Sequence, residues 1–296
     1  MIDYPALAAL AAVLREGSFE RAAGALGVTP SAVSQRVRGL EERLGCALVV
    51  RGQPPVATGA GARLVAHYER VRLLESEVAE DLPALGGAGP GRLKVAVNAD
   101  SLGTWFPPAA AGFAAASGVM LDLVLDDEGH TAERLRTGEV LAAVTADPSP
   151  VPGCRLIGLG ALRFLPVASP GFVARHFADG VTEAALRRAP MLRFDHRDEL
   201  QARWARQVLG VERLEAPAHW VPSTQGFLDM ALVGLGWAMN PVQLAGPHLA
   251  AGRLVALHEE GLDVALHWQH ARLGQGLMEK LTREVVAAAR RGLVQG

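Results

Sequence analysis

The sequence predicts a mixed α/β protein whose N-terminal part is helical, and three observations carry this prediction. Residues 4–44 contain helical segments that end at glycines, and a Gly-rich stretch lies at 86–91. Segments typical of strands and helices then alternate to the end of the chain. Such alternation is typical of helices layered on a largely parallel sheet. We therefore expect a helical head followed by an α/β body.

The composition is that of a globular protein. Half of the 296 residues are hydrophobic and a fifth are charged. No apolar run reaches the ~18–20 residues that a membrane span needs, and the N-terminus lacks the features of a secretory signal. Cys46 and Cys154 stand far apart, which argues against a disulfide framework and against a zinc site. We expect a cytoplasmic protein that uses no metal and no cofactor.

Charge is distributed unevenly, although the formal net charge is only −2. Residues 1–65 hold seven arginines and five acids, whereas residues 66–85 hold two arginines and five acids. Arginine makes bidentate contacts with phosphate, so a mildly basic head suits DNA binding. A general preference for arginine codons is the alternative explanation.

The head has the layout of a helix-turn-helix. Ser18 is placed to cap a short helix over 19–26. After a tight turn, Thr29 caps a longer helix with Pro30 at its first position. One face of the second helix is apolar and is expected to be buried, namely Ala32, Val33, Val37, Leu40 and Leu44. A polar face lies opposite, as in helices that enter the DNA major groove.

A wing and a long helix follow. We expect a strand at 47–51, a turn, and a return strand at 56–57, after which Thr58 caps a helix that runs to about residue 82. Its apolar positions recur every three or four residues: Leu64, Tyr68, Val71, Leu74, Val78 and Leu82. Such a helix needs a partner, and a second copy of itself is the simplest one. The expected domains are a winged helix-turn-helix over 1–58, a dimerising linker helix over 59–85 and a hinge over 86–91.

Several runs of residues resemble a known family. Residues 17–23, 28–37 and 40–45 resemble the DNA-binding domain of LysR-type regulators. In the second half, residues 97–105, 133–140 and 194–196 resemble the ArgP/LysG subgroup, which controls the export of basic amino acids. The resemblance implies an effector domain over 92–296 with two α/β subdomains, like a periplasmic binding protein. Subdomain I would hold 92–161 and 268–296, and subdomain II would hold 162–267.

The polar face of the helix that begins at Pro30 supplies the expected DNA contacts. Short polar side chains near the start of a recognition helix reach base edges, while arginines and helix N-termini hold phosphates. Base-edge contacts are expected from Ser31, Ser34, Gln35 and Arg38. Phosphate or wing contacts are expected from Arg36, Arg51, Ser18 and Thr58. Position 30, often Gln in this family, is Pro here, so base readout at this end differs. For the helix alone, an ordinary solvated face is the alternative.

Two segments of the body are suited to an anionic ligand group. Residues 98–104 leave a predicted strand and enter a helix near Trp105, and residues 223–225 precede a helix over 226–233. Ligands in α/β folds bind at such places because free amides at helix N-termini favour anions. We expect contacts from the hydroxyl-bearing Ser101, Thr104 and Thr224. The alternative is that Ser101 and Thr224 serve only as helix N-caps.

A basic amino acid also needs carboxylates, since a buried unpaired cation is costly. Asp100, Asp147 and Asp195 each follow or close a predicted strand on the expected cleft side. Residues 126–128 form an acidic cluster at another strand end. The expected effector contacts are therefore Asp100, Ser101, Thr104, Asp147, Asp195 and Thr224. For each acid a solvated loop is the alternative.

The sequence lacks a catalytic constellation. His196 lies beside Asp195, but no Ser or Cys stands in a nucleophile-elbow context and no HExxH occurs. Trp220, Trp237 and Trp268 are expected in the core. The resemblance implies a regulator, not an enzyme, that binds double-stranded DNA as a homodimer or homotetramer, with RNA polymerase as a further candidate partner. The alternative is an architectural or replication-associated DNA-binding protein whose α/β half only mediates oligomerisation. An enzyme with an accessory DNA module has no residues to support it.

Overall fold

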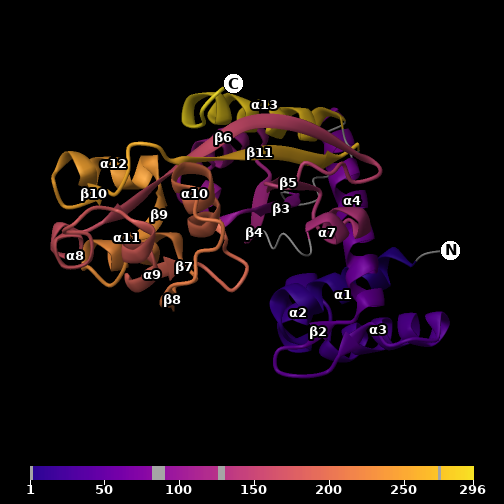
Figure 1. The fold of residues 1–296 in the computed structure, drawn as a ribbon. Coiled ribbons are helices and arrows are strands. Elements are labelled where there is room, and N and C mark those ends of the chain that lie inside the picture. The colour runs from indigo at the N-terminus through magenta and orange to yellow at the C-terminus, as the bar shows by residue number, and fades with distance from the viewer. Residues whose placement is uncertain (1–2, 82–90, 126–130, 273–274) are drawn as a thin grey trace.

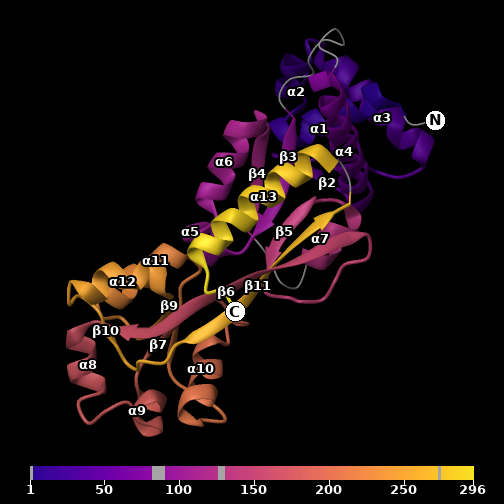
Figure 2. The same cartoon turned by 90° about the horizontal axis from the view of Figure 1, so that it is seen from above.

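The computed structural model describes residues 3–81, 91–125, 131–272 and 275–296. A helical head is joined by one long helix to an elongated α/β body (Figure 1). Seen from above, the body has helices gathered at both ends of a pair of long strands (Figure 2). The predicted α/β class with a helical N-terminal module is therefore confirmed.

The head contains α1 (Tyr4–Glu16), α2 (Phe19–Leu26), α3 (Pro30–Leu44) and the antiparallel wing strands β1 (Val49–Val50) and β2 (Val56–Ala57). The predicted caps are present, since Ser18 Oγ accepts from the Arg21 amide at 3.0 Å and Thr29 Oγ1 accepts from the Ala32 amide at 3.2 Å. The core of the head includes Leu7, Leu10, Val13, Val33 and Val37. The prediction that Leu44 is buried was wrong: it is 50% exposed, because α3 has passed beyond α1 and α2 by its last turn.

The long helix α4 (Gly59–Asp81) connects the two cores. Leu64 and Tyr68 pack against the core of the head, whereas Leu73 is buried in the core of the body. Leu74 is 41% exposed. The side chain of Val78, Leu82 and nearly all of the predicted hinge at 86–91 lie outside the described residues. Tyr68 thus serves the head's own core, and Leu74 marks the open face of the helix.

The body is built on one long sheet. Its strands are β3 (Arg92–Val97), β4 (Met120–Leu125), β5 (Ala142–Thr145), β6 (Cys154–Ala168), β9 (Ala238–Pro241), β10 (Val255–Ala256) and β11 (Leu262–Ala271). The order is β10-β6-β11-β5-β3-β4, with β9 also on β6. In this sheet only the β3 pairings with β4 and β5, among the described strands, are parallel, so the largely parallel sheet was wrong. The physical reason is that the chain crosses the body outward on β6 and back on β11, which makes these neighbours antiparallel.

Helices cover both ends of this sheet (Figures 1 and 2). One end carries α5 (Ala99–Gly103), α6 (Pro107–Ser117), α7 (Thr131–Thr137) and α13 (Gln275–Gly292). The other carries α8 (Pro170–His176), α9 (Glu183–Arg188), α10 (Leu200–Leu209), α11 (Thr224–Leu232), α12 (Val242–Ala250) and the small parallel sheet of β7 (Met191–Arg193) and β8 (Ala218–Trp220). The helix expected from near Trp105 is α6, which begins at Pro107, whereas the short helix α5 before it was not expected. Pro107 stands at the first position of α6, where its missing amide hydrogen leaves no helical hydrogen bond unmade.

The three tryptophans that were expected in the core differ in their exposure to solvent. Trp237 and Trp268 are fully buried, as expected. Trp220 is 43% exposed, so its placement in the core was wrong. It ends β8, a strand that pairs only with β7 within the described part of the chain. There its ring contacts His196 at a centroid distance of 4.0 Å, and the Arg193 guanidinium lies over it at 5.0 Å.

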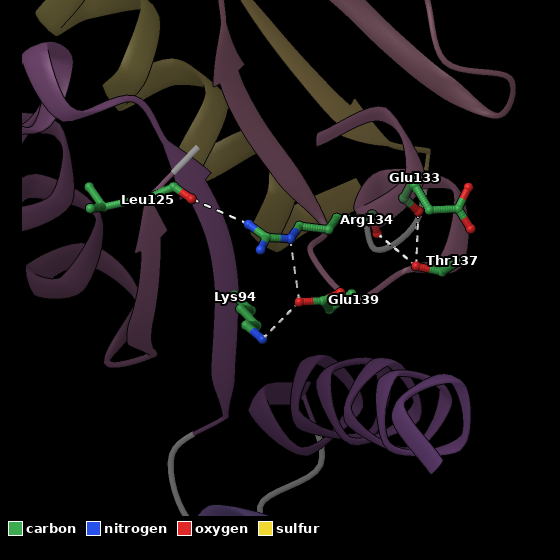
Figure 3. A network of polar contacts seen from close by, with 6 residues as sticks. All are labelled: Lys94, Leu125, Glu133, Arg134, Thr137 and Glu139. Carbon is green, nitrogen blue, oxygen red and sulfur yellow. Dashed lines mark hydrogen bonds and ion pairs between the residues drawn. The ribbon is translucent and has the colours of Figure 1, made fainter. Parts of the chain in front are cut away.

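A polar network joins the strands β3 and β4 to the turn on which the long helix α4 packs (Figure 3). Glu139 Oε1 lies 3.5 Å from Lys94 Nζ and 3.7 Å from Arg134 Nε, and Arg134 Nη1 donates to the Leu125 carbonyl at 3.3 Å. The preceding residue, Gly138, has a φ of +74°. A Cβ added there would lie 2.8 Å from the guanidinium carbon of Arg70 on α4. The linker helix therefore packs closely on this turn.

Candidate DNA interface and effector cavity

The outer face of α3 does not pack against the core of the head and is accessible to solvent. Ser31, Gln35, Arg36 and Arg38 are exposed and Ser34 is half-buried, while Val33, Val37 and Leu40 are buried beneath them. The predicted base-contacting residues Ser31, Ser34, Gln35 and Arg38 thus share one accessible side of the helix. The wing is held beside α3 because Glu41 Oε1 accepts from the amides of Leu48 and Val49 at 2.8 and 3.3 Å.

The residues predicted to contact phosphates differ in whether their side chains already have hydrogen-bond partners. Arg51 is exposed and its guanidinium lies 5.8 Å from the centre of the Phe19 ring. Ser18 Oγ already accepts from the Arg21 amide. Thr58 Oγ1 donates to the Ala47 carbonyl at 2.8 Å and accepts from the Gly61 amide at 3.1 Å. Since a hydroxyl has one proton, Thr58 has none left for a phosphate in this geometry.

A cavity of about 330 Å³ lies between the two groups of helices of the body. Its apolar walls include Leu162 and Phe164 of β6, Val264 and Leu266 of β11, and Phe227 of α11. Its charged and polar lining residues are Asn98, Asp100, Asp195, Arg197, Asp198, Glu199, Arg203, Thr224 and Asn240. An apolar cavity with convergent polar groups is suited to a small amphipathic ligand.

Asp100 joins the two sides of the cavity. Its Oδ1 accepts from Thr224 Oγ1 at 3.0 Å, which links α5 to the first residue of α11. Burial raises the pKa of Asp100 to about 6; the Thr224 hydrogen bond opposes this rise and the negative charge of Asp198 adds to it. A carboxyl group with this pKa favours a ligand cation, because the cation would replace the water that burial has removed.

Of the six predicted effector residues, the structure brings Asp100, Asp195 and Thr224 to the cavity. Ser101 is buried and accepts from Trp105 Nε1 at 2.9 Å, and Thr104 donates to the Asp100 backbone carbonyl. Asp147 accepts hydrogen bonds from the side chain and from the backbone amide of Ser149, the amide at 2.8 Å, and these bonds lower its pKa. None of these last three is among the cavity's lining residues. The acidic cluster at 126–128 lies outside the described residues.

The predicted helix caps at this site were misplaced. Ser223, not Thr224, caps α11, with its Oγ accepting from the Gly226 amide at 3.1 Å. Ser101 lies inside α5, whose N-cap position is Asn98. The hydroxyl of Thr224 is consequently turned to Asp100 and not to its own helix.

Further charged and polar residues that the sequence did not predict line the cavity: Arg197, Asp198, Glu199, Arg203 and Asn240. The run of charges at 195–199 directly after β7 is a signal that favours a site. Burial raises the pKa of Asp195, but hydrogen bonds from the Arg197 and Asp198 amides and the Arg197 charge outweigh it, so the pKa is lowered. The signal at Asn240 was a polar residue at the end of an otherwise apolar strand.

The chain matches two family models. Residues 5–62 match the bacterial regulatory helix-turn-helix protein model of the lysR family, and residues 86–293 match the LysR substrate binding domain. The chain belongs to the LysR family. Its winged head and two-subdomain body are the two modules of that family, and the resemblance seen in the sequence is confirmed.

Curated relatives of this LysR-family chain are regulators. It is 44% identical to the HTH-type transcriptional regulator LysG of Mycobacterium tuberculosis over 295 residues, covering 100% of this chain and 96% of the relative. It is 44% identical to ArgP of Pseudomonas aeruginosa over 297 residues, covering 100% and 98%. It is 45% identical to the lysine export transcriptional regulatory protein LysG of Corynebacterium efficiens over 284 residues, covering 96% and 97%.

Solved structures agree with the fold. ArgP from Mycobacterium tuberculosis matches with a TM-score of 0.79 and 44% identity, covering 100% of both chains. Full-length LysG from Corynebacterium glutamicum, solved with the effector Arg bound, matches with a TM-score of 0.69 and 39% identity over 99% of this chain and 100% of that one. Among the described residues, no helix combines the length and apolar character needed to cross a membrane, and no group of His, Cys, Asp and Glu side chains is arranged to hold a metal.

Proposed function

We propose that this LysR-type transcription regulator binds a basic amino acid in the cavity between its subdomains and controls the gene of a basic amino acid exporter. The charge of the cavity carries the proposal. Its described lining holds the carboxylates Asp100, Asp195, Asp198 and Glu199 against the guanidinium groups Arg197 and Arg203. Lysine and arginine carry two cations and one carboxylate, so this excess of negative charge complements them.

The apolar walls support a ligand with a long methylene chain. Leu162, Phe164 and Val264 provide a surface on which such a chain packs while its charged ends reach the polar rim. The arginine bound to the Corynebacterium glutamicum relative and the lysine export regulator of Corynebacterium efficiens point to the same ligand class. Lysine, arginine and histidine are therefore the candidate effectors.

Within the cavity we assign the cation contacts to Asp100 and Asp195, and a hydroxyl contact to Thr224. Ser101, Thr104 and Asp147 are not carried into this proposal, because none of them is among the residues that line the cavity. Binding would replace the Asp100–Thr224 hydrogen bond with ligand contacts and shift the two subdomains by the effector's differential affinity for their arrangements.

On DNA, we assign base-edge contacts to Ser31, Ser34, Gln35 and Arg38 and phosphate contacts to Arg36 and Arg51. Two copies paired through α4 would read two half-sites of double-stranded DNA in the bacterial cytoplasm. RNA polymerase is the further partner through which an activator would act. The chain would catalyse no reaction and need no cofactor.

Calorimetric titration of the full-length chain with L-lysine, L-arginine and L-histidine tests the effector assignment. L-norleucine is the matched control, because it keeps a lysine-like aliphatic chain and the α-groups but lacks the second cation. We expect binding of the basic amino acids and little binding of norleucine, together with a changed promoter footprint. Equal binding of norleucine, or no heat with any basic amino acid, contradicts the proposal. A footprint that ignores every bound amino acid would favour a purely architectural role.

A further inference from the structure

Asn240 is a fully buried carboxamide in the wall of the cavity. It lies on β9, lines the cavity and exposes none of its surface. Neither its Oδ1 nor its Nδ2 has a hydrogen-bond partner within the described part of the chain. Buried polar side-chain atoms are paired in the large majority of cases, so two unpaired atoms on one side chain need a reason.

The strand itself does not require this amide. β9 pairs with β6 through its backbone, with Asn240 opposite Leu165, and its neighbours Ala238 and Met239 are apolar and buried. A leucine has the same branched arrangement of side-chain heavy atoms and would occupy this strand position without unpaired polar atoms. An unpaired carboxamide at this position costs stability and makes no hydrogen bond that the fold uses.

We propose that Asn240 is a specificity-determining residue that binds the α-carboxylate and the α-ammonium group of the effector. This assignment rests on the proposed function. Nδ2 donates to the carboxylate and Oδ1 accepts from the ammonium. Because Asn240 is fully buried, the contact requires a small rearrangement of the cavity wall on binding.

The two unpaired atoms decide which end of the ligand is bound. The side-chain ammonium of lysine or the guanidinium of arginine only donates, so it would leave Nδ2 unpaired. The α-carbon of a free amino acid carries an acceptor and a donor side by side, which pairs both atoms of one carboxamide. The Oδ1 atom of Asn98, also buried, unpaired and in the cavity lining, provides a second acceptor for the same ammonium.

This geometry selects free amino acids over diamines. Cadaverine has the same chain and two cations as lysine but no carboxylate, so it satisfies Asp100 and Asp195 and leaves Nδ2 without an acceptor. The carboxylates of the cavity by themselves would bind cadaverine well. Asn240 is thus the residue that excludes it.

The test measures affinities of the full-length chain for L-lysine and cadaverine by calorimetry, and thermal midpoints without ligand. We expect Asn240→Leu to bind lysine about 10- to 100-fold more weakly, to lose most of the preference over cadaverine, and to melt at a higher temperature than the wild type. Asn240→Asp keeps the shape but offers no donor, so its preference should shift toward cadaverine. His248→Leu is the matched control: it removes a buried unpaired nitrogen of α12 outside the cavity lining and should keep lysine affinity and preference.

Three outcomes overturn the assignment. Wild-type lysine affinity and preference in Asn240→Leu would show that the amide does not contact the effector. A lower melting temperature in Asn240→Leu, with an unchanged lysine-to-cadaverine preference in Asn240→Asp, would show that the amide serves the fold. Absence of lysine, arginine and histidine binding by the wild type would overturn the proposed function and this assignment together, whereas the first two outcomes leave the proposed function intact.

Discussion

Replacing Asp100 with asparagine separates the two consequences of burying a carboxylate in the cavity. The pKa of Asp100 is raised from 3.8 to about 6, chiefly by burial. At about 1.36 kcal/mol per pH unit, charging this group costs about 3 kcal/mol more in the folded chain than in the unfolded chain. The carboxamide that replaces the carboxylate keeps an oxygen that accepts from Thr224. Asp100→Asn should therefore stabilise the ligand-free chain by up to about 3 kcal/mol at pH 7.

The pH dependence has a defined sign. Because the folded pKa exceeds the unfolded value, the penalty is fully present above pH 6 and disappears as the pH falls toward 3.8. The stability difference between Asp100→Asn and the wild type should thus shrink between pH 7 and pH 4. Effector binding needs the ionised carboxylate, so wild-type lysine affinity should be about tenfold weaker at pH 5 than at pH 7.

Two measurements check this reasoning on full-length protein. Urea unfolding monitored by tryptophan fluorescence at pH 4 to 7 gives the stability difference, and calorimetry gives lysine affinity over the range where both proteins stay folded. Asp100→Asn should bind lysine about 10- to 100-fold more weakly at pH 7. Asp263→Asn is the control, since it changes a carboxylate outside the cavity. The hydrogen bond from Arg163 outweighs burial and lowers the pKa of Asp263. The stability difference between Asp263→Asn and the wild type should therefore have the opposite pH dependence. An Asp100→Asn chain that is less stable than the wild type at pH 7, or that binds lysine equally well, would refute the argument.

The remaining predictions concern the DNA interface and the linker helix. Gln35→Ala should cost about 1–3 kcal/mol of discrimination at particular base pairs, and equal losses of affinity for operator and random DNA would contradict base reading. Arg51→Ala should weaken binding to all DNA sequences and make the affinity depend less steeply on salt concentration. Leu74→Glu should give monomers in sedimentation and lose operator binding, since this exposed position of α4 lies off the head's core. An unchanged sedimentation profile would mean that the two copies do not pair through this face of α4. Gly138→Ala should lower the free energy of unfolding by about 1–2 kcal/mol, because the φ of residue 138 is +74° and the added Cβ would meet the guanidinium of Arg70 on α4. An unchanged stability in denaturant unfolding would contradict this prediction.

The sequence determined much of what depends on residues close together in the chain, most clearly in the helical head. The caps at Ser18 and Thr29, the apolar stripe of Val33, Val37 and Leu40, and the wing are all local patterns, and each is present in the structure. Local hydrogen bonds and helical periodicity are set by neighbouring residues, so a sequence carries them directly. The polar face of α3 follows from the same periodicity, because burying one stripe exposes the opposite one.

Only the tertiary structure decided what depends on distant segments. Asp100 and Thr224 meet across 124 residues, and Asn240 joins the same cavity from a third segment. Ser101 and Thr104 carry the same chemistry as Thr224, yet the fold turns them to Trp105 and to a backbone carbonyl. The antiparallel course of β6 and β11 was decided in the same way, by the path of the chain between subdomains. The composition specifies which chemical groups are available for a site. Whether these groups meet in one cavity depends on how distant elements pack, and local sequence patterns do not determine that packing.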